Sequence, residues 1–217
     1  MKIALIGATG FVGAAVLKEA LDKGHEVIAL ARHPENIEVE NENLTAIAVD
    51  VFDTDALAEA LKGSDIVISA YNPGWTNPNI YADALKGAAS IQEATKKAGV
   101  KRLLVIGGAG SLFVAPGLQL IDTPEFPAAY KEGAGAARDY LNIIQKEETL
   151  DWTFLSPAIE MHQGTSGTRV GKYRIGLDNP MFDENNRSIL SVEDLALAIV
   201  DEAEQAKHIR QRFTVAY

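Results

Sequence analysis

Regularly spaced glycines near the start of the chain could bind a phosphate. Gly7, Gly10 and Gly13 follow directly on the apolar stretch Lys2–Ile6 and precede a helix-like stretch. In a strand–turn–helix of this kind the first backbone N–H groups of the helix stay free for an anion. The first glycine permits the tight turn, the second lets the pyrophosphate approach the main chain, and the third allows close contact of helix and strand. Although coincidental glycines in an ordinary turn are the alternative, the placement predicts a dinucleotide-binding turn formed by Gly7, Ala8, Thr9, Gly10, Phe11, Val12 and Gly13.

A cation follows the second predicted strand. NAD-binding proteins usually place an Asp or Glu there to bind the ribose 2′-hydroxyl. Here the strand Glu26–Leu30 is followed by Ala31, Arg32 and His33. A guanidinium in this place can form two hydrogen bonds to a 2′-phosphate. We therefore expect NADP(H) as the preferred cofactor and NAD(H) as the alternative, unless Arg32 is an ordinary solvated arginine.

The spacing Gly-x-x-Gly-x-x-Gly resembles the short-chain dehydrogenase/reductase superfamily in its extended and atypical branches. Length and further segments are similar to the atypical group that contains NmrA-like proteins, NADH–flavin reductases and biliverdin reductase B. The similarity spans nearly the whole chain and is carried by Gly7–Gly13, Arg32, Asp50-Val51, the glycine-rich segment after Ile106, Leu150–Ala158 and Ser191–Asp194.

This resemblance implies roles for further residues. Asp50 and Val51 would lie beside the adenine, although Asp50 could equally be a turn residue. Ser111 is a candidate catalytic residue that would lie near the nicotinamide, or it could equally be a loop serine that bonds its own backbone. Ser69, Ala70 and Tyr71 would lie at the nicotinamide ribose, although Tyr71 could also be an ordinary half-buried aromatic residue. Pro157 and Ala158 would lie beside the carboxamide, and Gly107 and Gly108 complete the implied cofactor contacts.

The proton relay of this superfamily is missing. Short-chain dehydrogenases generally use a Tyr followed four residues later by a Lys, so that both lie on one helix face. No tyrosine of this chain has a lysine at that position: the fourth residues are Trp75, Leu85, Ala134, Ile144 and Leu177. Tyr130-Lys131 falls where the motif belongs, but adjacent helical residues point about 100° apart. Tyr130 therefore remains a candidate catalytic residue only if it faces the pocket.

The missing tyrosine–lysine pair limits the substrates that the protein could reduce. Reduction of a ketone or a sugar carbon needs a proton transfer matched to the hydride, whereas a flavin or quinone can take its proton from solvent. The leading hypothesis is an NAD(P)H-dependent oxidoreductase that reduces a flavin, a quinone or a similar small-molecule acceptor by direct hydride transfer. Two alternatives stay open: an NAD-dependent sugar-nucleotide epimerase/dehydratase-like enzyme, and a non-catalytic NmrA-like NADP(H) sensor.

Candidate substrate residues lie later in the chain. Biliverdin reductase B carries a histidine just after the proline that Pro157 matches. Here that place is near Ile159, and His162 is the closest histidine, which argues against biliverdin reduction. His162 is a candidate substrate residue, with a plain loop residue as the alternative. Arg169 and Tyr173 could receive a planar or anionic substrate, although we rather expect that loop to be a solvated hairpin around 172–175.

These residues need a scaffold, and the chain alternates short apolar runs with helix-like stretches. Such alternation predicts an α/β, Rossmann-type, doubly wound and mainly parallel sheet with helices on both faces. We expect one domain, 1–217, with a small substrate-side region around 156–190. The predicted strands are 2–6, 26–30, 44–49, 65–69, 102–106, 152–155 and 213–215; the predicted helices are 11–23, 54–61, 79–98, 129–148 and 192–206.

Composition sets further limits. The chain has 217 residues, 47% of them hydrophobic, and no cysteine, so disulfides and thiolate metal sites are excluded. The formal net charge of −10 argues against nucleic acid as a partner. No segment reaches the run of roughly 18 apolar residues that a membrane helix needs. We expect a cytoplasmic monomer or homodimer without a metal.

Overall fold

The computed structural model describes all 217 residues and is built around one eight-stranded sheet. The strand order is β3-β2-β1-β4-β5-β8-β10-β9, and every neighbouring pair is parallel except β10 with β9. The strands are β1 (Lys2–Ile6), β2 (Glu26–Ala31), β3 (Leu44–Ala48), β4 (Ile66–Ser69), β5 (Arg102–Ile106), β8 (Asp151–Ser156), β9 (Arg174–Gly176) and β10 (Gln211–Ala216).

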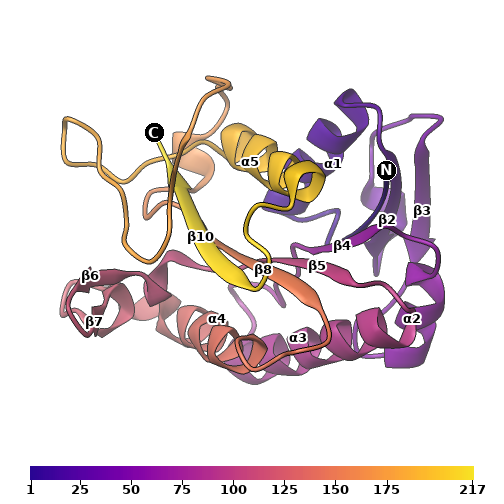
Figure 1. Cartoon of the computed structure of the whole chain (residues 1–217), viewed down its shortest axis with the longest axis horizontal. Helices are drawn as coiled ribbons and strands as arrows, with labels where there is room; N and C mark the ends of the chain where they lie inside the picture. Colours follow the sequence, from indigo (N-terminus) through magenta and orange to yellow (C-terminus); the bar gives the residue numbers. More distant parts are fainter.

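Five α-helices cover the two faces of this sheet. They are α1 (Phe11–Asp22), α2 (Thr54–Leu61), α3 (Ile80–Lys97), α4 (Lys131–Ile144) and α5 (Val192–Gln205). In Figure 1, α1 and α5 lie above the sheet and α2, α3 and α4 lie below it. Each face has its own hydrophobic cluster, with Leu5 and Phe213 on the α1–α5 side and Ile6 and Phe154 on the other. The central strands read as continuous apolar runs because both of their faces are buried.

The parallel arrangement brings the carboxyl ends of the strands to one edge. In the register of the sheet Ile6 is paired with Leu30 and Ser69, and Ile106 is paired with Leu155. The connections run in opposite directions on the two sides of β1 and β4, and in such sheets ligands bind outside the carboxyl ends at this switch point. The predicted α/β, doubly wound, Rossmann-type fold is confirmed.

Most predicted elements match within a few residues, but two regions differ. The hairpin expected around 172–175 does not form; instead Arg174–Gly176 adds to the sheet edge and is antiparallel to β10. The stretch 111–127, which lies outside every predicted strand and helix, contains the two-stranded hairpin β6 (Phe113–Ala115) and β7 (Leu118–Gln119). Short 3-10 helices complete the chain: η1 (Pro34–Asn36), η2 (Ala109–Ser111), η3 (Leu120–Asp122), η4 (Ala128–Tyr130) and η5 (Gln163–Thr165).

The segment between β8 and α5 is tied to the helix that follows it. Ser191 caps α5 by accepting from the Asp194 N–H, and Asp194 is fully buried. The Asp194 carboxylate accepts from the N–H groups of Val170 and Gly171, both at 2.8 Å. No helix in the structure combines the length and the apolar character that a membrane crossing requires.

Candidate functional site

The three glycines of the turn after β1 differ in how much space surrounds the position of a Cβ. Gly7 has a φ of +81°, and a Cβ there would lie 2.7 Å from the Ala70 carbonyl oxygen. A Cβ on Gly13 would lie 2.0 Å from the Gly7 carbonyl oxygen. A Cβ on Gly10 would meet only that same oxygen, at 3.3 Å. Gly7 and Gly13 are thus required by the turn itself, whereas Gly10 keeps open the space outside it.

The first turn of α1 offers unpaired backbone donors. Gly10 is the N-cap and supplies no side chain, and no protein atom accepts from the N–H groups of Phe11, Val12 or Gly13. Among the α-helices only α1 lacks an acidic residue in its first turn. Free N–H groups, the positive end of the helix dipole and an open approach together suit a pyrophosphate.

Arg32 follows β2 at the same edge of the sheet. Its side chain is exposed and has no hydrogen-bond or ion-pair partner. Every other arginine of the chain has a protein partner: Arg102, Arg138, Arg169, Arg174, Arg187, Arg210 and Arg212. The guanidinium of Arg32 is therefore available to an anionic ligand.

Tyr71, after β4, lies within electrostatic reach of Arg32 and Asp50. Its hydroxyl donates to the Asp83 carbonyl oxygen at 3.2 Å, and its ring lies against Gly87. Burial raises the pKa of Tyr71 to about 12; the nearby Asp83 and Asp50 carboxylates act in the same direction and Arg32 opposes them. The structure thus brings the ends of β2, β3 and β4 together, with Tyr71 turned towards α3.

Asp50 has a role in the turn after β3. Its Oδ1 accepts from the Phe52 N–H at 2.9 Å, and the residue is exposed. This is the turn interpretation that the sequence left open, and it leaves Oδ2 without a protein partner. The neighbouring Val51 is buried, with 8% of its surface exposed. Lys86 from α3 lies 4.5 Å from the centroid of the Phe52 ring.

The ends of β5 and β8 form the other half of the edge. The Gly107 N–H donates to the Leu155 carbonyl oxygen at 2.8 Å, and a Cβ on Gly107 would lie 2.0 Å from Phe154 Cζ. A Cβ on Gly108 would meet nothing closer than 3.8 Å. Pro157 and Ala158 follow β8 directly, and both are buried. The structure therefore brings this expected group together.

Ser111 is buried in η2, with 2% of its surface exposed. Arg212 Nη1 donates to the Ser111 carbonyl oxygen at 3.2 Å and to its Oγ at 3.3 Å. The Arg212 guanidinium is in turn held by Asp178 Oδ1, at 2.6 Å from Nη2. The hydroxyl of Ser111 thus faces a buried cation from β10.

Tyr130 lies at the end of η4 and leaves 51% of its surface exposed. Its hydroxyl has no partner, and its ring meets the edge of Trp75 with the centroids 5.2 Å apart. Trp75 was missed in the sequence. The available signal was an aromatic residue in the short Pro- and Gly-containing segment after β4.

The three candidate substrate residues are not gathered at the glycine turn. Arg169 forms two hydrogen bonds to Glu19 in the second half of α1, at 2.6 and 2.9 Å. The Tyr173 hydroxyl donates to Asp201 in the second half of α5 at 2.6 Å, and burial together with Asp201 raises the pKa of Tyr173. His162 is exposed and its Nδ1 accepts from the Gly164 N–H at 3.1 Å. Arg169 and Tyr173 thus attach their loop to the α1–α5 layer.

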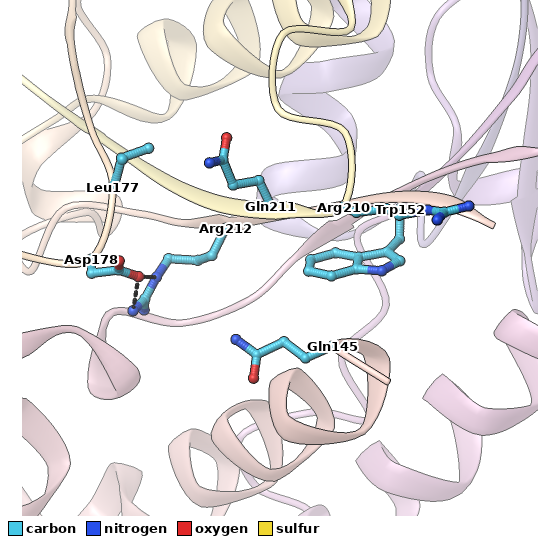
Figure 2. Close-up of a pocket in the computed structure, with 7 residues that line it drawn as sticks. All are labelled: Gln145, Trp152, Leu177, Asp178, Arg210, Gln211 and Arg212. Atoms are coloured by element: carbon cyan, nitrogen blue, oxygen red, sulfur yellow. Dashed lines mark hydrogen bonds and ion pairs between the residues drawn. The ribbon is translucent and has the colours of Figure 1, made fainter. Parts of the chain in front are cut away.

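A cavity of about 240 Å³ lies away from the glycine turn, near the first residues of β8 and β10. Figure 2 shows it between β10 and the end of α4, with the Arg212–Asp178 pair on one side. Its lining residues are Gln145, Trp152, Leu177, Asp178, Arg210, Gln211 and Arg212. No residue of the glycine turn lines this cavity.

The chain matches known proteins over nearly its full length. A family model described as NAD(P)H-binding matches residues 7–206. An uncharacterised Bacillus subtilis protein, YwnB, is 38% identical over 217 residues, which cover 99% of this chain and 98% of that protein.

Solved structures extend the comparison. A Bacteroides thetaiotaomicron protein described as a "putative epimerase" is 48% identical with a TM-score of 0.92, covering 100% of this chain and 96% of the other. A Streptococcus pneumoniae protein described as a "putative NADH-flavin reductase" is 33% identical with a TM-score of 0.85, covering 100% and 99%. These names and folds agree with the atypical short-chain dehydrogenase/reductase group expected from the sequence.

Proposed function

The chain belongs to the family of NAD(P)H-binding proteins, and on that premise we propose that it is an NADP(H)-preferring reductase of a flavin, a quinone or a similar conjugated acceptor. The family and the solved neighbours support an NAD(P)-dependent oxidoreductase. The finer proposal is supported by the free N–H groups at the start of α1 and the unpaired Arg32, in a chain that has no tyrosine–lysine pair.

The residues at the carboxyl edge divide the work of binding. The N–H groups of Phe11, Val12 and Gly13 would hold the pyrophosphate, and Gly10 would leave room for it. Arg32 would pair with the 2′-phosphate, which supports NADP(H) over NAD(H). We propose that the remaining sequence candidates line the adenine and nicotinamide halves: Asp50, Val51, Ser69, Ala70, Tyr71, Gly107, Gly108, Pro157 and Ala158.

The chemistry needs little from the protein beyond orientation. When bound, the reduced nicotinamide supplies a hydride. The edge formed by β4, β5 and β8 would hold donor and acceptor face to face. With the hydride from the reduced cofactor and one proton from solvent, the acceptor would be fully reduced, so charge and atoms would balance without an acid from the protein. We propose that Ser111, held by its hydrogen bonds with Arg212, shapes this edge of the site and does not donate a proton.

The proposal includes a small-molecule acceptor and a cytoplasmic location, where reduced pyridine nucleotides are regenerated. The direct test is NADPH oxidation, followed by loss of absorbance, with FMN, FAD, riboflavin and menadione as acceptors. We expect turnover with at least one of them, and NADH at equal concentration should support less. Inactivity with all four acceptors would contradict the proposal.

Two further measurements separate the alternatives. Clear thermal stabilisation by UDP- or dTDP-sugars would favour an epimerase or dehydratase, the activity named for the Bacteroides neighbour. Tight NADPH binding in calorimetry without turnover, together with a partner protein that binds only one redox form of the complex, would favour a sensor. The missing Tyr/Lys pair disfavours the first of these outcomes.

A further inference from the structure

Two exposed aromatic side chains stand together at the carboxyl edge of the sheet. Trp75, in the segment between β4 and α3, leaves 56% of its surface exposed, and Tyr130 leaves 51% exposed. Their ring planes meet at 80°. Single exposed apolar residues are common and need no explanation. Two exposed aromatic rings in contact are less common, and one of them is one of only two tryptophans in the chain.

The segment that carries Trp75 is fixed by local hydrogen bonds. Asn72 Oδ1 accepts from the Gly74 N–H at 2.7 Å, and Gly74 has a φ of +106°. Asn77 Nδ2 donates to Asp83 Oδ2 at 2.8 Å, which joins the segment to α3. The indole is therefore presented by an ordered turn.

Helix α4 leaves room for the indole. A Cβ at Gly133 would lie 2.7 Å from Trp75 Cζ3 and 3.0 Å from Ile80 Cδ1. Glycine is unfavourable in a helix because it loses the most backbone freedom. Its presence in the first turn of α4 indicates that one side of the indole rests against the helix backbone. The exposed part of the indole faces away from α4.

The pair adjoins the proposed nicotinamide side of the site. Trp75 comes four residues after Tyr71 at the end of β4. Tyr130 directly precedes α4, whose first turn contacts the segment after β5: a Cβ on Gly110 would lie 3.1 Å from Ala134 Cβ. Trp75 thus comes from the segment after β4, and Tyr130 comes from the long connection between β5 and β8. The ends of these three strands carry the proposed nicotinamide contacts.

We propose that Trp75 and Tyr130 form the surface on which the acceptor stacks, and that the acceptor is a planar conjugated ring system of the isoalloxazine or quinone type. This inference rests on the proposed function and adds to it a specificity-determining residue, Trp75. Aromatic faces attract one another without directional hydrogen bonds, so such a surface selects for flatness over particular substituents. In this proposal the ring of Tyr130 stacks on the acceptor, and its hydroxyl is not needed for binding.

The test compares Trp75→Leu, Tyr130→Leu and Tyr130→Phe with wild type. FMN binding to the protein–NADP⁺ complex is followed by quenching of the flavin fluorescence. Both Leu variants should raise the Kd for FMN about tenfold, the factor that corresponds to about 1.4 kcal/mol. Tyr130→Phe should keep the wild-type Kd, and no variant should change the Kd for NADPH more than about twofold. Tyr81→Phe is the matched control, since Tyr81 is exposed at the same end and bonds Asp139.

Each outcome decides the inference. An unchanged FMN Kd in Trp75→Leu, or no FMN binding by wild type at millimolar concentration, overturns it. A smaller particle mass for Trp75→Leu in light scattering also overturns it, because the pair would then be a contact between subunits. Trp75-dependent FMN binding without any NADPH oxidation supports the stacking surface and contradicts only the proposed reductase activity.

Discussion

At the residue scale, the turn after β1 separates glycines needed by the fold from a glycine needed by a ligand. A Cβ on Gly7 or on Gly13 would lie only 2.7 or 2.0 Å from a main-chain oxygen, so larger residues there would disturb the protein itself. Gly10 has ordinary extended torsion angles, and a Cβ there would meet a single protein atom, the Gly7 carbonyl oxygen at 3.3 Å. Its main steric partner would be the bound pyrophosphate.

The variant Gly10→Ala tests that distinction. We expect the free energy of unfolding to change by less than about 1 kcal/mol, because an N-cap Ala replaces a residue without a side-chain cap. The Kd for NADPH should rise at least about tenfold, since a methyl group would occupy the phosphate's approach. Urea unfolding and calorimetry on the same preparation measure both quantities. Gly13→Ala should impair both together, and unchanged NADPH binding in Gly10→Ala would refute the ligand role.

Arg32 makes a second prediction at this scale. Replacing it with Ala should weaken NADPH binding about 10- to 100-fold, since a hydrogen bond to a charged group contributes about 1.5–3 kcal/mol. NADH binding should stay within about twofold, because NADH has no 2′-phosphate for the guanidinium to meet. Calorimetric titration of both cofactors against Arg32→Ala and the exposed-charge control Lys62→Ala measures the difference. Equal loss for both cofactors would place Arg32 elsewhere than at the 2′-phosphate.

At the element scale, α1 stands apart from the other helices. Asp53 caps α2 and Ser191 caps α5, and every α-helix except α1 has an acidic residue in its first turn. The chain has 30 acidic residues, so their exclusion from this turn has a physical reason: a carboxylate there would compete with a bound phosphate.

The junction of α3 and α4 depends on an ionised carboxylate. Glu147, just after α4, accepts from Thr149 Oγ1 at 2.5 Å and its N–H at 2.7 Å, from Gln92 Nε2 at 2.7 Å and from Lys96 Nζ at 3.3 Å. The Thr149 hydroxyl is the largest cause that lowers the pKa of Glu147 to about 2, and burial opposes it. The charged form therefore joins the two helices to the start of β8.

This lowered pKa predicts an acid-sensitive contribution to stability. Because the pKa of Glu147 is lower in the folded than in the unfolded chain, its contribution is complete above about pH 5 and is lost as the pH falls towards about 2. Glu147→Gln should be less stable than wild type at pH 7 and should lose less stability between pH 5 and 3. Urea midpoints at pH 7, 5 and 3 check this. The control Glu148→Gln, an exposed neighbour, should follow wild type; an identical acid slope in both variants would refute the role of Glu147.

Local patterns predicted the elements well where residues near in sequence decide them. Strands β1 and β5 match at both ends, and the helix after Ser191 begins where the capping serine indicates. The edge strand β9 was missed as such because its partner β10 is distant in the chain. Ion pairs such as Arg169–Glu19 join residues far apart for the same reason, so no local signal could place them.

At the scale of the whole molecule, the core supports the site directly. The Phe154 side chain is fully buried and its ring lies against Gly107, at the end of β5. Phe154→Ala should lower the free energy of unfolding by about 3–5 kcal/mol, the usual cost of such a cavity. NADPH binding by the folded fraction should also weaken, because Gly107 loses its support. Urea unfolding and calorimetry measure both effects.

The matched control for this change is Phe182→Ala. Phe182 leaves 43% of its surface exposed, so its removal should alter the free energy of unfolding by no more than about 0.5 kcal/mol. If Phe154→Ala were destabilised but bound NADPH with wild-type affinity, Phe154 would support the core alone.

The bond from Arg212 to Ser111 has a consequence for the order of folding. The segment after β5 that contains Ser111 is held by the guanidinium of Arg212 in β10, which lies 101 residues later in the chain. During synthesis the earlier strands emerge first and can begin to pair. The hydrogen bonds from Arg212 to Ser111 nevertheless cannot form until β10 has left the ribosome and entered the sheet. We therefore expect a nascent chain stalled before residue 210 to be compact, yet to bind cofactor more weakly than the released protein.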